Sequence, residues 1–208
     1  MSEFHKPALF AGHEFSAFQG SADPAELSAL AHESARMLLA RVRGEGDSQL
    51  VDRVVAFADE NGIDVLAELW AASSAHSLPG VLWRLYLVRD LMRREAAQMS
   101  ILYGKGVEVL HSADPVVAGA PSPAGPDEMR ELADTILRGA FVGDFGGALE
   151  RAAAFCRVLS AGCTELANET DPVHPERASQ LTTQALRLSK TAQEFHICAR
   201  LWREGGLD

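Results

Sequence analysis

Four side chains near the middle of the chain are the strongest candidates for a binding site: Trp70, His76, Trp83 and Arg84. An imidazole, a guanidinium and two indoles can line a pocket, because pockets combine apolar walls with a few polar groups. They can equally form a corner of the core in which His76 caps the preceding helix. The sequence favours the corner, and a site for an anionic or aromatic small molecule is the alternative.

Arg84 carries the charge that most needs a partner. It lies in the largely apolar run Leu78–Met92, with no acid three or four residues away. A guanidinium that is buried without a partner costs several kcal/mol, so we expect Arg84 to meet a distant carboxylate, backbone carbonyls or a bound anion, or to reach solvent. Asp90, by contrast, lies within helical reach of Arg93 and Arg94.

Metal binding is the third hypothesis. Glu108 and His111 have the Glu-x-x-His spacing of di-iron helix bundles, which need a second such motif and two further carboxylates. We find no second motif, so we interpret the spacing as chance. Cys156 and Cys163 stand two helical turns apart, too far for one zinc ion, and we expect them to be buried. We therefore predict no metal-ligating residue and no cofactor, and a metal or haem protein ranks third among the possible functions.

Signatures of catalysis are missing from the sequence. It contains no nucleophile elbow and no glycine-rich phosphate loop. Cys198 and His196 are two residues apart on a helix, where side chains diverge, so they make a poor nucleophilic pair. We expect no catalytic residue, and we lean away from an enzyme.

Composition restricts the possible partners. The 208 residues carry a net charge of −10, a field that repels phosphate backbones, so nucleic acid is not an expected partner. The three cysteines and the absence of a signal-like start indicate a reduced, cytoplasmic protein. No apolar run approaches the ~20 residues that span a bilayer, so we expect no membrane partner.

The periodicity predicts an all-α fold, a single-domain bundle of about six to seven helices. A helix should follow the Asp23-Pro24 cap and end near Gly44. Two shorter helices are expected over 48–61 and 64–75. The buried central helix should run near 79–103, enclosed on nearly all sides in its first half, and end at Gly104 and Gly106.

The last two predicted helices have the most regular seams. Apolar residues recur at alternating steps of four and three in both. In the first they are Phe145, Leu149, Ala152, Cys156, Leu159, Cys163 and Leu166; in the second they are Leu181, Ala185, Leu188, Ala192, Phe195, Ala199 and Trp202. The short connection around Pro172 predicts that these helices are antiparallel neighbours.

Two segments stand outside this helical pattern within the single domain 1–208. Residues 1–22 contain four phenylalanines without a period, which indicates an aromatic arm lying on the body or on a neighbouring subunit. Residues 112–126 contain four prolines and form a loop at which two packing units can separate.

The run Ser77–Arg89, SLPGVLWRLYLVR, resembles short uncharacterised all-helical proteins of actinobacteria. That resemblance implies an all-helical fold and no particular activity. Together with the regular seams and the aromatic arm, the sequence favours a non-enzymatic protein-interaction or regulatory module that is homo-oligomeric.

Overall fold

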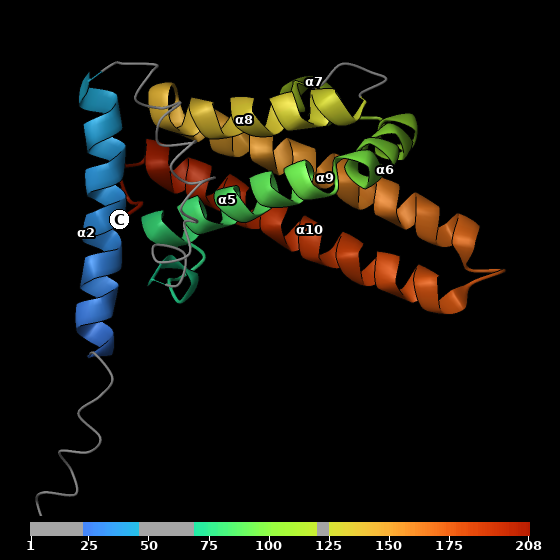
Figure 1. The fold of residues 1–208 in the computed structure, drawn as a ribbon, viewed down its shortest axis with the longest axis horizontal. Coiled ribbons are helices and arrows are strands. Elements are labelled where there is room, and N and C mark those ends of the chain that lie inside the picture. Colours follow the sequence, from blue (N-terminus) through green and yellow to red (C-terminus); the bar gives the residue numbers. More distant parts are fainter. Residues whose placement is uncertain (1–22, 46–68, 120–124) are drawn as a thin grey trace, which may run out of the picture.

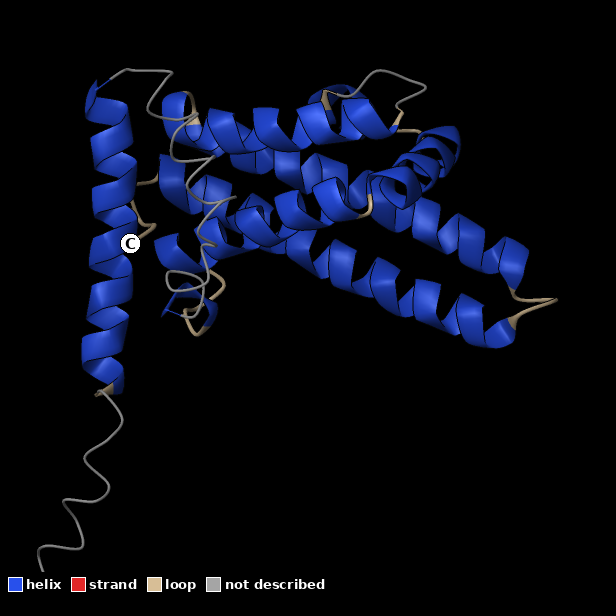
Figure 2. Cartoon of the chain, viewed as in Figure 1, coloured by secondary structure: helices blue, strands red, loops and turns tan. Residues whose placement is uncertain are grey.

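The chain folds into helices joined by loops (Figures 1 and 2). The computed structural model describes residues 23–45, 69–119 and 125–208, and these contain no strand. The predicted all-α bundle is therefore confirmed. One hydrophobic core contains side chains from helices on both sides of residues 112–126.

The longest helices, α9 (Phe145–Thr170) and α10 (Pro175–Arg203), form an antiparallel pair (Figure 1). All the predicted seam residues are buried except Leu166 and Trp202, which are partly buried. The Ser160 hydroxyl of α9 donates to the Ala185 carbonyl of α10 over 2.8 Å. The heptad-like seam therefore predicted this pairing correctly.

The predicted central helix consists of two helices, α5 (Leu78–Arg94) and α6 (Ala96–Val109). They meet at Glu95, whose backbone (φ −112°, ψ 31°) departs from helical geometry. The expected end at Gly104 and Gly106 is wrong, since α6 continues through both glycines. The expected enclosure of α5 fails at Leu87, which is 43% exposed.

Helix α6 crosses α9 with backbone against backbone at two glycines. A Cβ added to Gly106 would lie 2.0 Å from the Val158 carbonyl oxygen, and one added to Gly162 would lie 1.8 Å from that of Leu102. Real side chains do not approach that closely, so both positions need glycine. The glycine that resembled a helix terminator in the sequence is a packing contact.

Helix α8 (Pro126–Val142) packs on α5, α6 and α9. Its Asp134 lies 3.0 Å from Nε of Arg89 and 2.9 Å from Nη1 of Arg93. Arg89, rather than Arg84, is the arginine of α5 that is fully buried. The predicted pair of Asp90 with Arg94 forms at 2.7 Å.

The short helix α7 (Asp114–Ala118) lies within the proline-rich segment and packs on α9. Nη2 of Arg157 donates to Oδ1 of Asp114 over 2.7 Å. This hydrogen bond holds the pKa of Asp114 below its ordinary value. The Tyr103 hydroxyl of α6 donates to the Pro115 carbonyl, so α7 is attached to both α6 and α9.

Helix α2 (Pro24–Glu45) stands across one end of the bundle (Figure 1). Asp23 caps it, with its carboxylate accepting from the Ala25 amide over 3.0 Å. Ala31, Ala35 and Leu39 are buried, and the helix packs on α5 and α8. This agrees with the helix predicted from the Asp23-Pro24 cap.

Some expectations lie outside the described residues: the aromatic arm 1–22, the helix over 48–61, and most of the helix over 64–75. Of the last, Leu69–Ala71 are helical. Among the described helices, none combines the length and apolarity needed to cross a bilayer.

The α6–α9 crossing gives a stability prediction with an internal control. Gly106→Ala should lower the free energy of unfolding by about 1–3 kcal/mol, because the two helices must separate to admit the methyl group. Gly104→Ala, on the same helix with nothing within 4 Å of the added Cβ, should stabilise by about 0.5–1 kcal/mol. Urea denaturation followed by far-UV circular dichroism measures both. Equal effects at the two positions would contradict the close contact.

Candidate functional site

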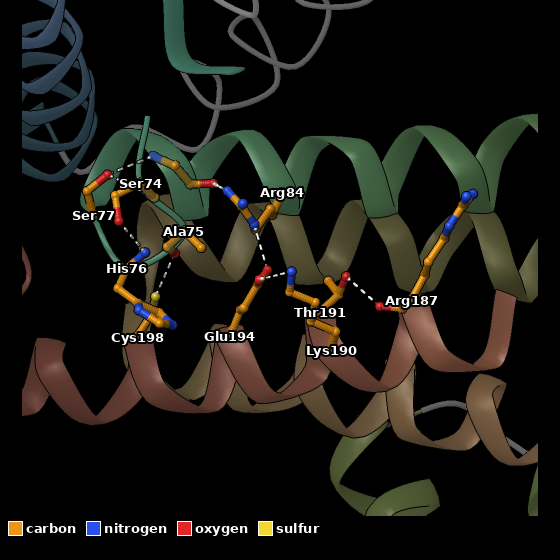
Figure 3. A network of polar contacts seen from close by, with 11 residues as sticks. Ser74, Ala75, His76, Ser77, Arg84, Arg187, Lys190, Thr191, Glu194 and Cys198 are labelled. Atoms are coloured by element: carbon orange, nitrogen blue, oxygen red, sulfur yellow. Dashed lines mark hydrogen bonds and ion pairs between the residues drawn. The ribbon is translucent and has the colours of Figure 1, made fainter. Parts of the chain in front are cut away.

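The start of α5 is held between a tight turn and α10 (Figure 3). The Ser77 hydroxyl donates to the Ser74 carbonyl over 2.9 Å and accepts from the Gly80 amide over 3.3 Å. A Cβ on Gly80 would lie 1.9 Å from the Ser74 oxygen, so the turn touches the helix backbone. From α10, the Cys198 thiol donates to the Ala75 carbonyl over 3.3 Å. These contacts fix where α5 begins relative to α10.

Arg84 extends from α5 to α10, where it meets a carboxylate. Its Nε donates to Oε2 of Glu194 over 2.7 Å, and its Nη1 donates to the Gly80 carbonyl over 2.9 Å. The two side chains are 24% and 12% exposed. The distant carboxylate and the backbone carbonyl that the sequence led us to expect are both present. The ion pair joins the first turns of α5 to the last part of α10.

The two candidate tryptophans have their own partners, away from Arg84. Trp70 is buried, and its indole N–H donates to the Ser34 hydroxyl of α2 over 3.1 Å. Trp83 is partly buried and stacks on Tyr86 with ring centroids 5.7 Å apart. Neither indole lines the cavity beside Arg84.

His76 lies in the turn before α5 and is exposed. Its backbone amide donates to the Ser74 hydroxyl over 3.3 Å (Figure 3). It too is absent from the lining of the cavity beside Arg84. A small-molecule site shared by His76 and Arg84 stays a prediction.

A groove opens between α5 and α10 beside the ion pair. Its volume is about 280 Å³. The lining residues are Arg84, Leu87, Val88 and Leu91 from α5, with Gln184, Arg187, Leu188 and Thr191 from α10. Val88 and Leu188 are nearly buried and Leu87 is exposed at the rim. The groove exists because α5 and α10 run antiparallel and diverge beyond the ion pair (Figure 1).

The groove is cationic although the protein is acidic. Among the residues that the structure describes, its lining contains two arginines and no carboxylate. Glu194 already neutralises Arg84. Arg187 makes no ion pair with any residue that the structure describes, and Figure 3 shows it extending from α10 toward α5. Arg187 therefore gives the groove its uncompensated positive charge.

A second depression continues this groove toward the start of α10. It measures about 580 Å³ and shares Leu91, Gln184 and Arg187 with the first. It ends near Arg177, and its lining includes the acid Glu95. From Arg177 to Thr191 a helix rises about 21 Å. The two depressions form one channel along α10, apolar at the inner end and polar at the outer end.

The thiols and candidate metal ligands do not assemble into a site. Within the described ranges, no group of three or more His, Cys, Asp or Glu side chains is placed to hold a metal ion. All three cysteines are buried and free. Burial raises the pKa of the Cys156 thiol to about 12 and that of Cys198 to about 11. His196 turns to Glu150, 3.1 Å away, rather than to Cys198.

Comparison with protein-family models, with curated proteins and with solved structures finds no match to this chain. The candidate site therefore rests on its own geometry.

Sequence reasoning missed Glu194 and Arg187. A signal for Glu194 was present, since it is the one acid between Glu176 and Glu204 on the last helix and flanks the seam residue Phe195. Arg187 carried no such signal, because its place in the groove depends on the angle between two helices distant in the sequence.

The Arg84–Glu194 ion pair should contribute measurably to stability. Arg84→Met and Glu194→Met should each destabilise, because each leaves a largely buried charge unpaired. The double variant should lose less than the sum, with a coupling energy of about 1–2 kcal/mol from urea denaturation. Lys190→Met, a largely exposed neighbour 4.0 Å from Glu194, should change stability by no more than about 0.5 kcal/mol. Purely additive effects at Arg84 and Glu194 would refute the pair.

The thiols should be inert in the folded protein. Because burial raises the pKa of all three cysteines, the reactive thiolate is scarce at pH 8. A disulfide reagent should therefore react far more slowly with the native protein than with denatured protein, in which three thiols titrate rapidly. One fast thiol in the native state would contradict this.

Proposed function

We propose that this protein is a non-enzymatic interaction module that binds an acidic amphipathic helix in the α5/α10 groove. The observation that carries the proposal is the groove's lining, which within the described ranges combines an apolar floor with an unpaired Arg187 and no carboxylate. In a chain of net charge −10, such a surface attracts a partner that bears negative charge beside apolar side chains.

The shape of the groove supports a helix over an enclosed small molecule. The groove is open, and its apolar part has a volume of about 280 Å³. It also continues along α10 as a channel. A channel of this shape suits helix-in-groove binding, in which a few apolar anchors at helical spacing enter a groove.

The side chains that line the groove support binding rather than catalysis. They are aliphatic residues, arginines, glutamine and threonine. The described part of the lining contains no His, Cys, Asp, Glu or Lys, the groups that most often transfer protons or attack substrates. Arginine does neither at ordinary pH, because it stays protonated, and it serves instead to recognise carboxylates.

A displayed library of randomised helical peptides tests this function. We expect the enriched peptides to carry leucine-like residues at helical spacing together with Asp or Glu. Leu87→Asp and Arg187→Glu should each weaken their binding by about tenfold or more, which corresponds to about 1.4 kcal/mol. Fluorescence anisotropy of one labelled peptide measures the change.

Two matched variants serve as controls for these substitutions. Leu186→Asp alters a leucine of α10 that is 72% exposed and does not line the groove. Arg200→Glu reverses an exposed arginine farther along α10. Both should bind the peptide within about twofold of the unmodified protein, as surface changes outside an interface do. A library that yields no binder, or binders that ignore Leu87 and Arg187, would overturn the proposed function.

A further inference from the structure

We infer that the helix bound in the α5/α10 groove is the first part of α2 from a second copy of this chain. The inference rests on the proposed function and names the partner for that groove. It follows from a match between two surfaces of one protein. One is an exposed acidic and apolar face of α2, and the other is the apolar, arginine-containing groove.

The first turns of α2 expose an apolar surface. Every residue from 23 to 30 is exposed, including Leu27 (43%) and Leu30 (53%). The buried face of the helix begins only at Ala31. In Figure 1 this end of α2 projects past α5. The two leucines are therefore available as anchors for a groove on another molecule.

The same surface of α2 is acidic. Glu26, Leu30 and Glu33 lie at positions i, i+4 and i+7, so they share one face of the helix. Neither glutamate forms an ion pair within the part of the chain that the structure describes. Two unpaired carboxylates thus flank the exposed Leu30. The carboxylates complement the positive charge of the groove, and the leucine complements its apolar floor.

The two surfaces also match in length. From Glu26 to Glu33 the helix rises about 10 Å, and so does α5 from Arg84 to Leu91. Leu27 and Leu30 can therefore lie over the apolar floor while Glu33 approaches Arg187. Arg84 remains paired with Glu194, so docking leaves that ion pair intact.

The contact joins two different surfaces, so in a closed dimer it occurs twice. Each copy then inserts its own α2 into the groove of the other. Because both surfaces belong to one chain, the association needs no other protein.

Charge reversal on the two surfaces tests the inference in the full-length protein. Unmodified protein should associate across the micromolar range in sedimentation velocity. Arg187→Glu and Glu33→Arg should each weaken association by about tenfold or more, since each places like charges together. Arg200→Glu and Glu131→Arg, exposed charges outside both surfaces, should leave it within about twofold. Far-UV circular dichroism should show that every variant is folded.

Mixing the two reversed variants provides the decisive measurement. In the mixture, Glu33 of the Arg187→Glu chain meets the original Arg187, and the new Arg at 33 meets the new Glu at 187. Association should therefore return when the variants are combined, and also in the double variant. Absence of recovery, or a strictly monomeric unmodified protein, overturns the inference. If library peptides still depend on Leu87 and Arg187 in that case, the groove remains a docking site and only its occupant is wrong.

Discussion

The backbone contact between α6 and α9 at Gly106 and Gly162 is the constraint on which the rest of the structure depends. With a Cβ-to-oxygen approach of 1.8–2.0 Å, neither position has room for a side chain. The contact fixes α6 on α9, and α5 must then approach through the break at Glu95. At its other end, α5 is fixed by the Ser74–Ser77 turn and by the Arg84–Glu194 ion pair.

The groove follows from these fixed ends. Helix α10 keeps its long seam with α9, whereas α5 turns away to join α6, so the two helices separate after the Arg84–Glu194 pair (Figure 1). Leu87 and Leu91 would be enclosed if α5 followed α10 over its whole length. Instead they line an open surface together with Leu188 and Arg187. Apolar residues that the sequence suggested for a core therefore line an open groove.

What the sequence predicted and what it missed have separate physical causes. The α9–α10 pairing was predictable because a seam of small and apolar residues repeats over many turns and leaves one face to bury. The predicted end of the helix at Gly104 and Gly106 is wrong because glycine has two roles in helices. It can end a helix, and it can also let two helices cross closely, as Gly106 does. A single helical wheel cannot show where a neighbouring helix diverges, so Leu87 was assigned to an enclosed face.

Only those features of the candidate site that depend on neighbouring residues of the same helix could be predicted from the sequence. Arg84 lacked an acid on its own helix, which correctly implied a distant partner, and Glu194 is that partner. His76, Trp70 and Trp83 were grouped because they are close in sequence. In the fold, the hydrogen bond to Ser34 draws Trp70 toward α2, and the stacking on Tyr86 occupies Trp83. Neighbours in sequence at a helix junction diverge because each helix faces a different layer.

Self-association of an acidic protein is opposed by repulsion between the negative charges of the two copies. The strength of that repulsion depends on the distance between the charges relative to the screening length of the solution. Two copies of charge −10 repel over their whole surfaces, but at physiological ionic strength charges farther apart than about 8 Å are largely screened. A carboxylate in contact with Arg187 inside a partly apolar groove is screened much less. Salt therefore weakens the repulsion between copies more than it weakens the proposed Glu33–Arg187 contact. The leucines add a term that does not depend on charge, so the association should tolerate physiological salt.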